Sequence, residues 1–142
     1  MIQTLSQFPE IKFYIYNLNF KTSLSKNLIV KNFSEREFLN DLINCQAVIA
    51  NGGFTLMSEA IYLGKPMLSW PIKNDFEQIL NAILLEKSGY GKFVSTMNTQ
   101  IFEEFLNNLN LYKNNLKNYH QDKNKIFEEK LKNILIKIRP IL

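Results

Sequence analysis

Short runs of apolar, β-favouring residues alternate with amphipathic helical segments along most of this sequence. Such alternation is typical of βαβ units, in which helices cover both faces of a parallel sheet. The runs are short and mostly apolar, as strands buried on both faces are. The pattern therefore predicts an α/β fold with a parallel sheet. Its expected strands cover residues 12–16, 28–30, 47–50, 66–69 and 92–94.

Capping residues and glycines mark the ends of the intervening helices. A Ser or Asp followed three residues later by Glu or Gln predicts a reciprocal capping box, and glycine favours the left-handed residue that ends a helix. The expected helix starts are the boxes Ser34-Glu37 and Asp75-Gln78, the cap Thr55 and the residue Thr99, and the expected ends are Gly64 and Gly89. From about residue 111 the chain is helical in composition, and its expected buried stripe is Ile126, Leu131, Ile134, Leu135 and Ile138.

Composition narrows the class of protein. A chain of 142 residues with 46% hydrophobic content can bury one core, so residues 1–142 are expected to form a single domain. No stretch reaches the roughly 18 to 20 apolar residues that span a bilayer, and no leader pattern precedes the domain, so a cytoplasmic protein is expected. Cys45 is the only cysteine and has no neighbouring metal ligand, so a small core or near-core residue is the simplest role for it.

The net charge of +4 does not indicate nucleic acid, because it is concentrated at one end. From Lys113 onward eight basic residues stand against three acidic ones, so the rest of the chain is close to neutral. A basic helical tail is most often a solvated face, and less often a contact with anionic lipid or with another domain. His120, the only histidine, lies in this tail, where a surface role is expected.

The most informative stretch runs from Asn51 to Glu59, where a buried strand meets two glycines and then a helix. The first N–H groups of a helix have no intrahelical acceptor, and the helix dipole attracts anions there. Gly52 and Gly53 would let a phosphate approach the backbone, Thr55 could add a hydroxyl, and Glu59 could accept hydrogen bonds from a sugar diol. A tight turn with a capping Thr55 and a solvated Glu59 explains the same spacing equally well.

A second stretch follows the next expected strand and contains Glu77 and Gln78. Ligands of open parallel sheets bind beyond the carboxyl ends of the strands, so loops after neighbouring strands can contact one ligand. Glu77 and Gln78 would then present an acceptor and an amide to hydroxyl groups. On spacing alone, a capping box between Asp75 and Gln78 explains Gln78 without any ligand.

Several ordered motifs together resemble the donor site of GT-B glycosyltransferases. The motifs are Asn51-Gly-Gly-Phe-Thr-Leu-Met-Ser-Glu-Ala, Gly64-Lys-Pro, Pro71, Glu77-Gln78, Asn81-Ala82 and Gly89-Tyr-Gly91. The resemblance is to UDP-glucuronosyltransferases and to the N-acetylglucosaminyl transferase that forms lipid II, and it is dense from Phe33 to Gly91. It implies a Rossmann-like domain that is the C-terminal half of a GT-B fold. The chain opens on what resembles the end of a helix, at residues 2–8, so the first βα unit of that half is expected to be absent.

The resemblance also implies roles for individual residues. Gly52, Gly53 and Thr55 would hold the diphosphate of a UDP-sugar. Glu59 would accept hydrogen bonds from the ribose hydroxyls.

The remaining implied contacts are to the sugar and the base. Glu77 and Gln78 would contact the transferred sugar, and Phe33 stands where such enzymes place the base. Asn51 departs from the pattern because many members have a histidine there. Asn51 can still donate and accept hydrogen bonds, but it cannot carry a charge near neutral pH.

The mechanism implied is metal-independent transfer with inversion and no cofactor beyond the UDP-sugar donor. The general base and the acceptor pocket would belong to an acceptor-binding domain or partner subunit that this chain does not contain, with peripheral membrane contact as a further partner. Two alternatives stay open at this point: a non-catalytic remnant or binding module of the same fold, and a fragment of a nucleotide-sugar epimerase.

Overall fold

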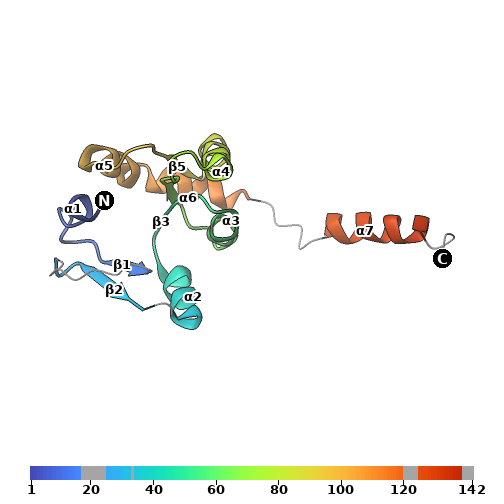
Figure 1. Cartoon of the computed structure of the whole chain (residues 1–142), viewed down its shortest axis with the longest axis horizontal. Helices are drawn as coiled ribbons and strands as arrows, with labels where there is room; N and C mark the ends of the chain where they lie inside the picture. The colour runs from blue at the N-terminus through green and yellow to red at the C-terminus, as the bar shows by residue number, and fades with distance from the viewer. Residues whose placement is uncertain (17–24, 33, 120–124, 139–142) are drawn as a thin grey trace.

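The computed structural model describes residues 1–16, 25–32, 34–119 and 125–138 (Figure 1). From residue 28 to residue 107 strands and helices alternate, in the order expected from the sequence. The elements are α1 (Ile2–Leu5), β1 (Phe13–Tyr16), β2 (Leu28–Lys31), α2 (Glu35–Asn44), β3 (Val48–Ala50), α3 (Phe54–Tyr62), β4 (Met67–Ser69), α4 (Phe76–Lys87), β5 (Gly91–Phe93), α5 (Thr99–Asn107), α6 (Leu109–Lys117) and α7 (Lys125–Ile138).

All strand pairs among the described residues are parallel, but the strands form two sheets rather than one. The first sheet has the order β1-β2 and the second has the order β3-β4-β5. The expectation of a parallel α/β fold is confirmed. The strand ends differ from the expected ones by a single residue at β1, β2, β3 and β4, and by one residue at each end of β5.

One apolar core joins the two sheets. Leu28 of β2 and Leu68 of β4 belong to the same cluster of buried side chains, together with Phe102 and Phe105 of α5. The aromatic rings of Phe8 and Phe102 meet edge to face, with their centroids 4.9 Å apart. Helix α5 therefore covers a face to which both sheets contribute.

The buried Asn27 ties α1 to the start of β2. Its side-chain amide donates to the carbonyl oxygens of Leu5, at 3.1 Å, and Phe8, at 2.9 Å. A buried carbonyl without a partner costs free energy, so one side chain that satisfies two of them fixes the short N-terminal helix.

The helix ends follow the expected glycines, and α2 starts after Ser34 as expected, but the capping box predicted there does not form. Gly64 and Gly89 have φ angles of 68° and 71°, the left-handed conformation expected after α3 and α4. Ser34 occupies the N-cap position of α2, but its side chain makes no capping hydrogen bond. The first turn of α2 contains Glu35 and Glu37, whose charges suit the helix dipole without a reciprocal box.

The expected buried stripe of the C-terminal tail is wrong where the structure describes its side chains. Ile126, Leu131 and Ile134 are exposed, while the side chains of Leu135 and Ile138 lie outside the described ones. In Figure 1, α7 stands apart from the rest of the chain, so its apolar stripe has no core to enter. No helix among the described residues has the length and apolar character needed to cross a membrane.

Candidate functional site

The corner between β3 and α3 is built from two glycines with different roles. Gly52 has a φ angle of 89°, which side-chain-bearing residues rarely adopt. Gly53 has a φ angle of −59° and is the N-cap of α3, which begins at Phe54. Thr55 therefore lies inside the first turn, so the expectation that Thr55 caps this helix is wrong. No side chain caps α3.

This corner leaves backbone donors free. Helix α3 forms its first intrahelical bond from Met57 N–H to the carbonyl of Gly53, at 3.1 Å, so the N–H groups before Met57 have no acceptor within the helix. Within the described chain, a Cβ built on Gly53 would have no atom within 4 Å. The helix N-terminus therefore faces open space and is not blocked by side chains, as an anion site requires.

Gly52 instead packs directly against α4. A Cβ on Gly52 would lie 2.8 Å from the backbone oxygen of Gln78 and 2.8 Å from the hydroxyl of Ser69. The carbonyl of Gly52 accepts a hydrogen bond of 3.1 Å from the side-chain amide of Asn81. The loops after β3 and β4 are thus brought together, as expected for loops at the carboxyl ends of neighbouring parallel strands.

The loop before α4 is held by both members of the expected capping box, but not reciprocally. Asp75 accepts a hydrogen bond of 3.1 Å from the backbone N–H of Gln78, so the cap is confirmed. The side-chain oxygen of Gln78 does not return to Asp75; it accepts from the N–H of Ile72 at 3.0 Å. Gln78 therefore shapes the loop with its oxygen and keeps its amide nitrogen for another acceptor.

The predicted site residues lie around this corner where the structure describes them. Asn51, Thr55 and Glu77 are exposed. Glu59 is half-buried and lines a depression of about 470 Å³ between α2 and α3, beside Leu39 and Tyr62. Phe33, the predicted base contact, lies outside the described residues.

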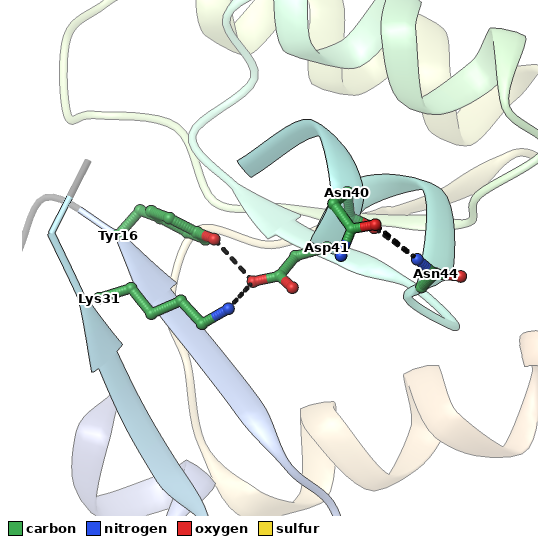
Figure 2. Close-up of polar contacts among 5 residues, drawn as sticks. All are labelled: Tyr16, Lys31, Asn40, Asp41 and Asn44. Carbon is green, nitrogen blue, oxygen red and sulfur yellow. Dashed lines mark hydrogen bonds and ion pairs between the residues drawn. The ribbon is translucent and has the colours of Figure 1, made fainter. Parts of the chain in front are cut away.

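A polar network lies at the end of β2. The Tyr16 hydroxyl and the Lys31 ammonium both donate to Asp41 on α2, at 2.6 and 2.7 Å (Figure 2). A depression of about 430 Å³ is lined by Lys31, Asp41 and neighbouring residues of α2. Neither this depression nor the one beside Glu59 is lined by residues 51–55, of which Gly52 is buried and the other four are exposed. The network fixes α2 against the first sheet.

The pKa of the Asp41 carboxyl reflects these contacts. Burial alone would raise it, but the hydrogen bonds from Lys31 and Tyr16 and the Lys31 charge hold the pKa below its usual 3.8. A carboxyl with a lowered folded-state pKa contributes stability above its unfolded pKa and loses that contribution as the pH falls through the folded value.

Replacing Asp41 by Asn should therefore destabilise the fold by about 1 kcal/mol near pH 7, because a charge-assisted pair becomes a neutral one. The penalty should shrink as the pH falls below about 3.8, because the unfolded carboxyl takes up its proton first and the native carboxyl follows at its lower pKa. Urea denaturation at pH 7 and pH 3 measures both values. Glu103→Gln, an exposed change on α5, is the control. A penalty that is equal at the two pH values would contradict the assignment.

Cys45 has the structural role expected from the sequence. Its thiol is half-buried and donates to the carbonyl of Leu42 at 3.2 Å. Burial raises its pKa, outweighing the Lys65 charge, so the group stays a thiol near neutral pH.

Two residues that shape the corner are absent from the predicted set. Asn81 anchors Gly52, and its signal was present, because the pair Asn81-Ala82 belongs to the recognised motif. Ser69 is fully buried beneath Gly52, and its hydroxyl has no hydrogen-bond partner among the described residues. No sequence signal distinguishes this serine from any other residue of a buried strand.

Comparison with known proteins places the fold and the corner in one family. The family model described as "Glycosyl transferase family 1" matches residues 1–110. An uncharacterised glycosyltransferase of Methanosarcina mazei is 39% identical over 71 residues, which is 47% of this chain and 19% of that protein. The chain therefore belongs to glycosyl transferase family 1.

A second relative has a named activity. It is the UDP-N-acetylglucosamine--N-acetylmuramyl-(pentapeptide) pyrophosphoryl-undecaprenol N-acetylglucosamine transferase 3 of Bacillus cereus, 26% identical over 124 residues. The match covers 72% of this chain and 35% of the relative. This chain thus spans about a third or less of the relatives that it matches.

Solved structures show the same fold at low sequence identity. The glycotransferase of kitacinnamycin superposes with a TM-score of 0.68 at 18% identity, over 82% of this chain and 32% of that one. The spinosyn forosaminyltransferase SpnP gives a TM-score of 0.67 at 20% identity, over 80% and 32%. The fold is that of GT-B glycosyltransferases, and the matched part is 32% of each of these two chains.

Proposed function

We propose that this chain is the donor-binding half of a glycosyltransferase that binds a UDP-sugar. The observation that carries the proposal is the corner at residues 51–55: an uncapped helix N-terminus, open to solvent, that follows directly from a strand. Backbone N–H groups and the helix dipole together provide about half a positive charge for a diphosphate. Membership of the family and the chemistry of this corner support the same ligand class.

Different residues of this chain would contact different parts of the UDP-sugar. Gly53 lets the diphosphate approach the first N–H groups of α3, and Thr55 adds its hydroxyl. Glu59, one turn further along, accepts hydrogen bonds from the ribose diol. Glu77 and the free amide nitrogen of Gln78 contact the transferred sugar from the start of α4. Phe33 would lie beside the base.

Transfer then relies on the same backbone groups. As the bond to the diphosphate breaks with inversion at the sugar, negative charge grows on the leaving oxygen. Preorganised N–H donors at the helix N-terminus stabilise this charge without having to reorient. The proton of the acceptor hydroxyl is removed by a base that belongs to the acceptor-binding half.

Apolar side chains on the rim of the corner suit contact with that second half. Phe54, Ile72 and Phe76 are exposed by 56% or more of their surface, and all three follow the carboxyl ends of β3 or β4. Large exposed apolar groups gathered at one edge mark an interaction surface. Sugar transfer should accordingly require the addition of an acceptor-binding polypeptide, and transfer by this chain alone would contradict the division.

Titration calorimetry with UDP and UDP-sugars tests the donor assignment. Glu59→Ala should weaken UDP binding about tenfold or more, since hydrogen bonds to a charged acceptor contribute about 1.5–3 kcal/mol. Glu77→Ala should lower the affinity for a UDP-sugar and leave that for UDP unchanged, because Glu77 is assigned to the sugar alone. The exposed Glu103→Ala on α5 is the matched control. Absence of UDP binding at millimolar concentrations would reject the proposal.

A further inference from the structure

Ser69, the last residue of β4, has a hydroxyl group that the fold buries completely. The residue has 0% of its surface exposed, and its Oγ makes no hydrogen bond with any residue that the structure describes. A buried hydroxyl without a partner costs free energy, which an alanine of nearly the same size would avoid. The surroundings of Ser69 show what this hydroxyl can bind.

The Ser69 hydroxyl lies directly beneath the turn that joins β3 to α3. A Cβ built on Gly52 would lie 2.8 Å from the Oγ of Ser69. Strand pairing sets this proximity, because Ser69 is the register partner of Ala50, two residues before Gly52. The turn at the proposed diphosphate site therefore packs on this hydroxyl.

The peptide group between Gly52 and Gly53 directs its two polar groups in opposite directions. The described chain has no cis peptide bond, and in a trans peptide the C=O and the N–H point away from each other. The Gly52 carbonyl points inward, where it accepts a hydrogen bond of 3.1 Å from the side-chain amide of Asn81 on α4. The N–H of Gly53 therefore points away from α4, on the side where a Cβ on Gly53 would meet open space.

The Gly52 carbonyl has room for a second hydrogen-bond donor. A carbonyl oxygen has two lone pairs, and Asn81 uses one of them. When the N–H of the same peptide group donates to an anion, the peptide is polarised and its carbonyl becomes a stronger acceptor. The hydroxyl of Ser69 is the buried donor next to Gly52 that has no hydrogen bond to give up.

We propose that Ser69 is a positioning residue of the donor site. When a diphosphate binds the N–H of Gly53, the Ser69 hydroxyl donates a hydrogen bond to the Gly52 carbonyl, beside the bond from Asn81. The two donors then hold the peptide group in the orientation that directs its N–H at the phosphate. Ser69 does not touch the ligand and acts through this peptide group alone. The inference rests on the proposed function, because the diphosphate is the ligand that brings about the hydrogen bond.

This role predicts opposite effects on stability and on affinity. In the free protein the hydroxyl has no partner, so it destabilises the fold slightly. In the complex it has a partner, so it contributes to binding. Groups that favour binding at the expense of stability are common in functional sites. A hydroxyl that served the fold alone would change stability and leave affinity unaltered.

Ser69→Ala tests the proposal by thermal denaturation and by titration of the full chain. The thermal midpoint should be unchanged or up to about 4 °C higher, because an unsatisfied buried group is removed. The dissociation constant for UDP should rise about three- to tenfold, the effect of one lost hydrogen bond between uncharged groups. The dissociation constant for uridine, which has no phosphate, should not change. Ser88→Ala, which removes an exposed hydroxyl at the other end of α4, is the matched control and should change none of these values.

Two further measurements separate hydrogen bonding from packing. Ser69→Cys fills the place of the hydroxyl with a thiol, which is a weak donor, so its UDP affinity should stay close to that of Ser69→Ala. Wild-type affinity in the cysteine variant would overturn the proposal, because filling space would then be sufficient. The carbonyl ¹³C resonance of Gly52 should move downfield when UDP binds the wild-type chain, and by less in Ser69→Ala, since a carbonyl that accepts a further hydrogen bond is more polarised.

The outcomes distinguish the role of Ser69 from the donor assignment. If the wild-type chain and Ser69→Ala bind UDP equally well, the role of Ser69 is rejected and the donor assignment stays. A thermal midpoint lowered by more than about 4 °C in Ser69→Ala would also reject this role, because the hydroxyl would then be bonded in the free protein. Equal losses of affinity for UDP and for uridine would contradict an action through the phosphates. Absence of UDP binding by the wild-type chain at millimolar concentrations would reject both proposals.

Discussion

Gly91→Ala should leave the chain largely unfolded. A Cβ on Gly91 would lie 1.9 Å from the backbone oxygen of Met67, its partner in the β4–β5 ladder. Backbone in a sheet cannot retreat as a flexible side chain can, so β4 and β5 would have to separate. We expect a loss of more than about 4 kcal/mol, a large part of the stability of a small domain. Circular dichroism and urea denaturation measure it.

Gly64→Ala supplies the control for this effect. Gly64 has a positive φ angle, but a Cβ there meets nothing within 4 Å. The variant should lose only about 1 kcal/mol, the cost of a left-handed residue with a side chain. A Gly91→Ala protein that unfolds cooperatively with a midpoint near that of the wild type would show that the two strands are not so closely paired.

Gly52→Ala should damage both the fold and the donor corner. The φ angle of 89° disfavours any side chain, and the added Cβ would clash with the backbone of Gln78. Strain and overpacking together should cost about 3 kcal/mol or more. Because Gln78 must shift, UDP affinity should fall as well. Thermal denaturation and calorimetric titration report the two effects separately.

Gly53→Ala, at the position next to Gly52, tests ligand binding separately from folding. Gly53 has an ordinary φ angle and open space around it, so this variant should lose no more than about 1 kcal/mol, the cost of alanine in place of glycine at an N-cap. If a diphosphate approaches the backbone there, the added methyl group should weaken UDP binding while the protein stays folded. Equal UDP affinity in wild type and Gly53→Ala would place the phosphates elsewhere.

The sequence predicted the elements well because their signals are local. Apolar runs such as residues 66–69, short and bounded by a glycine and prolines, favour a buried strand, and glycines such as Gly64 and Gly89 end helices through their own backbone preferences. The open corner at Gly53 was also predictable, since a strand followed by two glycines and a helix leaves few other geometries. Its ligand stays a prediction.

The features that the sequence did not predict depend on which of several residues forms a given hydrogen bond or packing contact. The side-chain oxygen of Gln78 could accept a hydrogen bond from the N–H of Asp75, as in a capping box, or from another backbone group. In the structure it accepts from the N–H of Ile72. The start of α3 at Phe54 rather than after Thr55 depends on the packing of Gly52 against α4. The C-terminal tail has apolar residues at helical spacing, but this spacing does not show against which surface they pack. Such outcomes are decided by tertiary contacts, which a local pattern does not contain.

The anchoring of Gly52 to α4 has a consequence for the proposed donor complex. Asn81 holds the Gly52 carbonyl while the backbone of Gln78 lies against Gly52, so the turn at Gly52 and the start of α4 should move together. In the proposed complex, a bulkier sugar cannot be accommodated by withdrawing α4, because the diphosphate cradle would move with it. Tolerance for larger sugars must then come from the surface that closes over the corner from the opposite side.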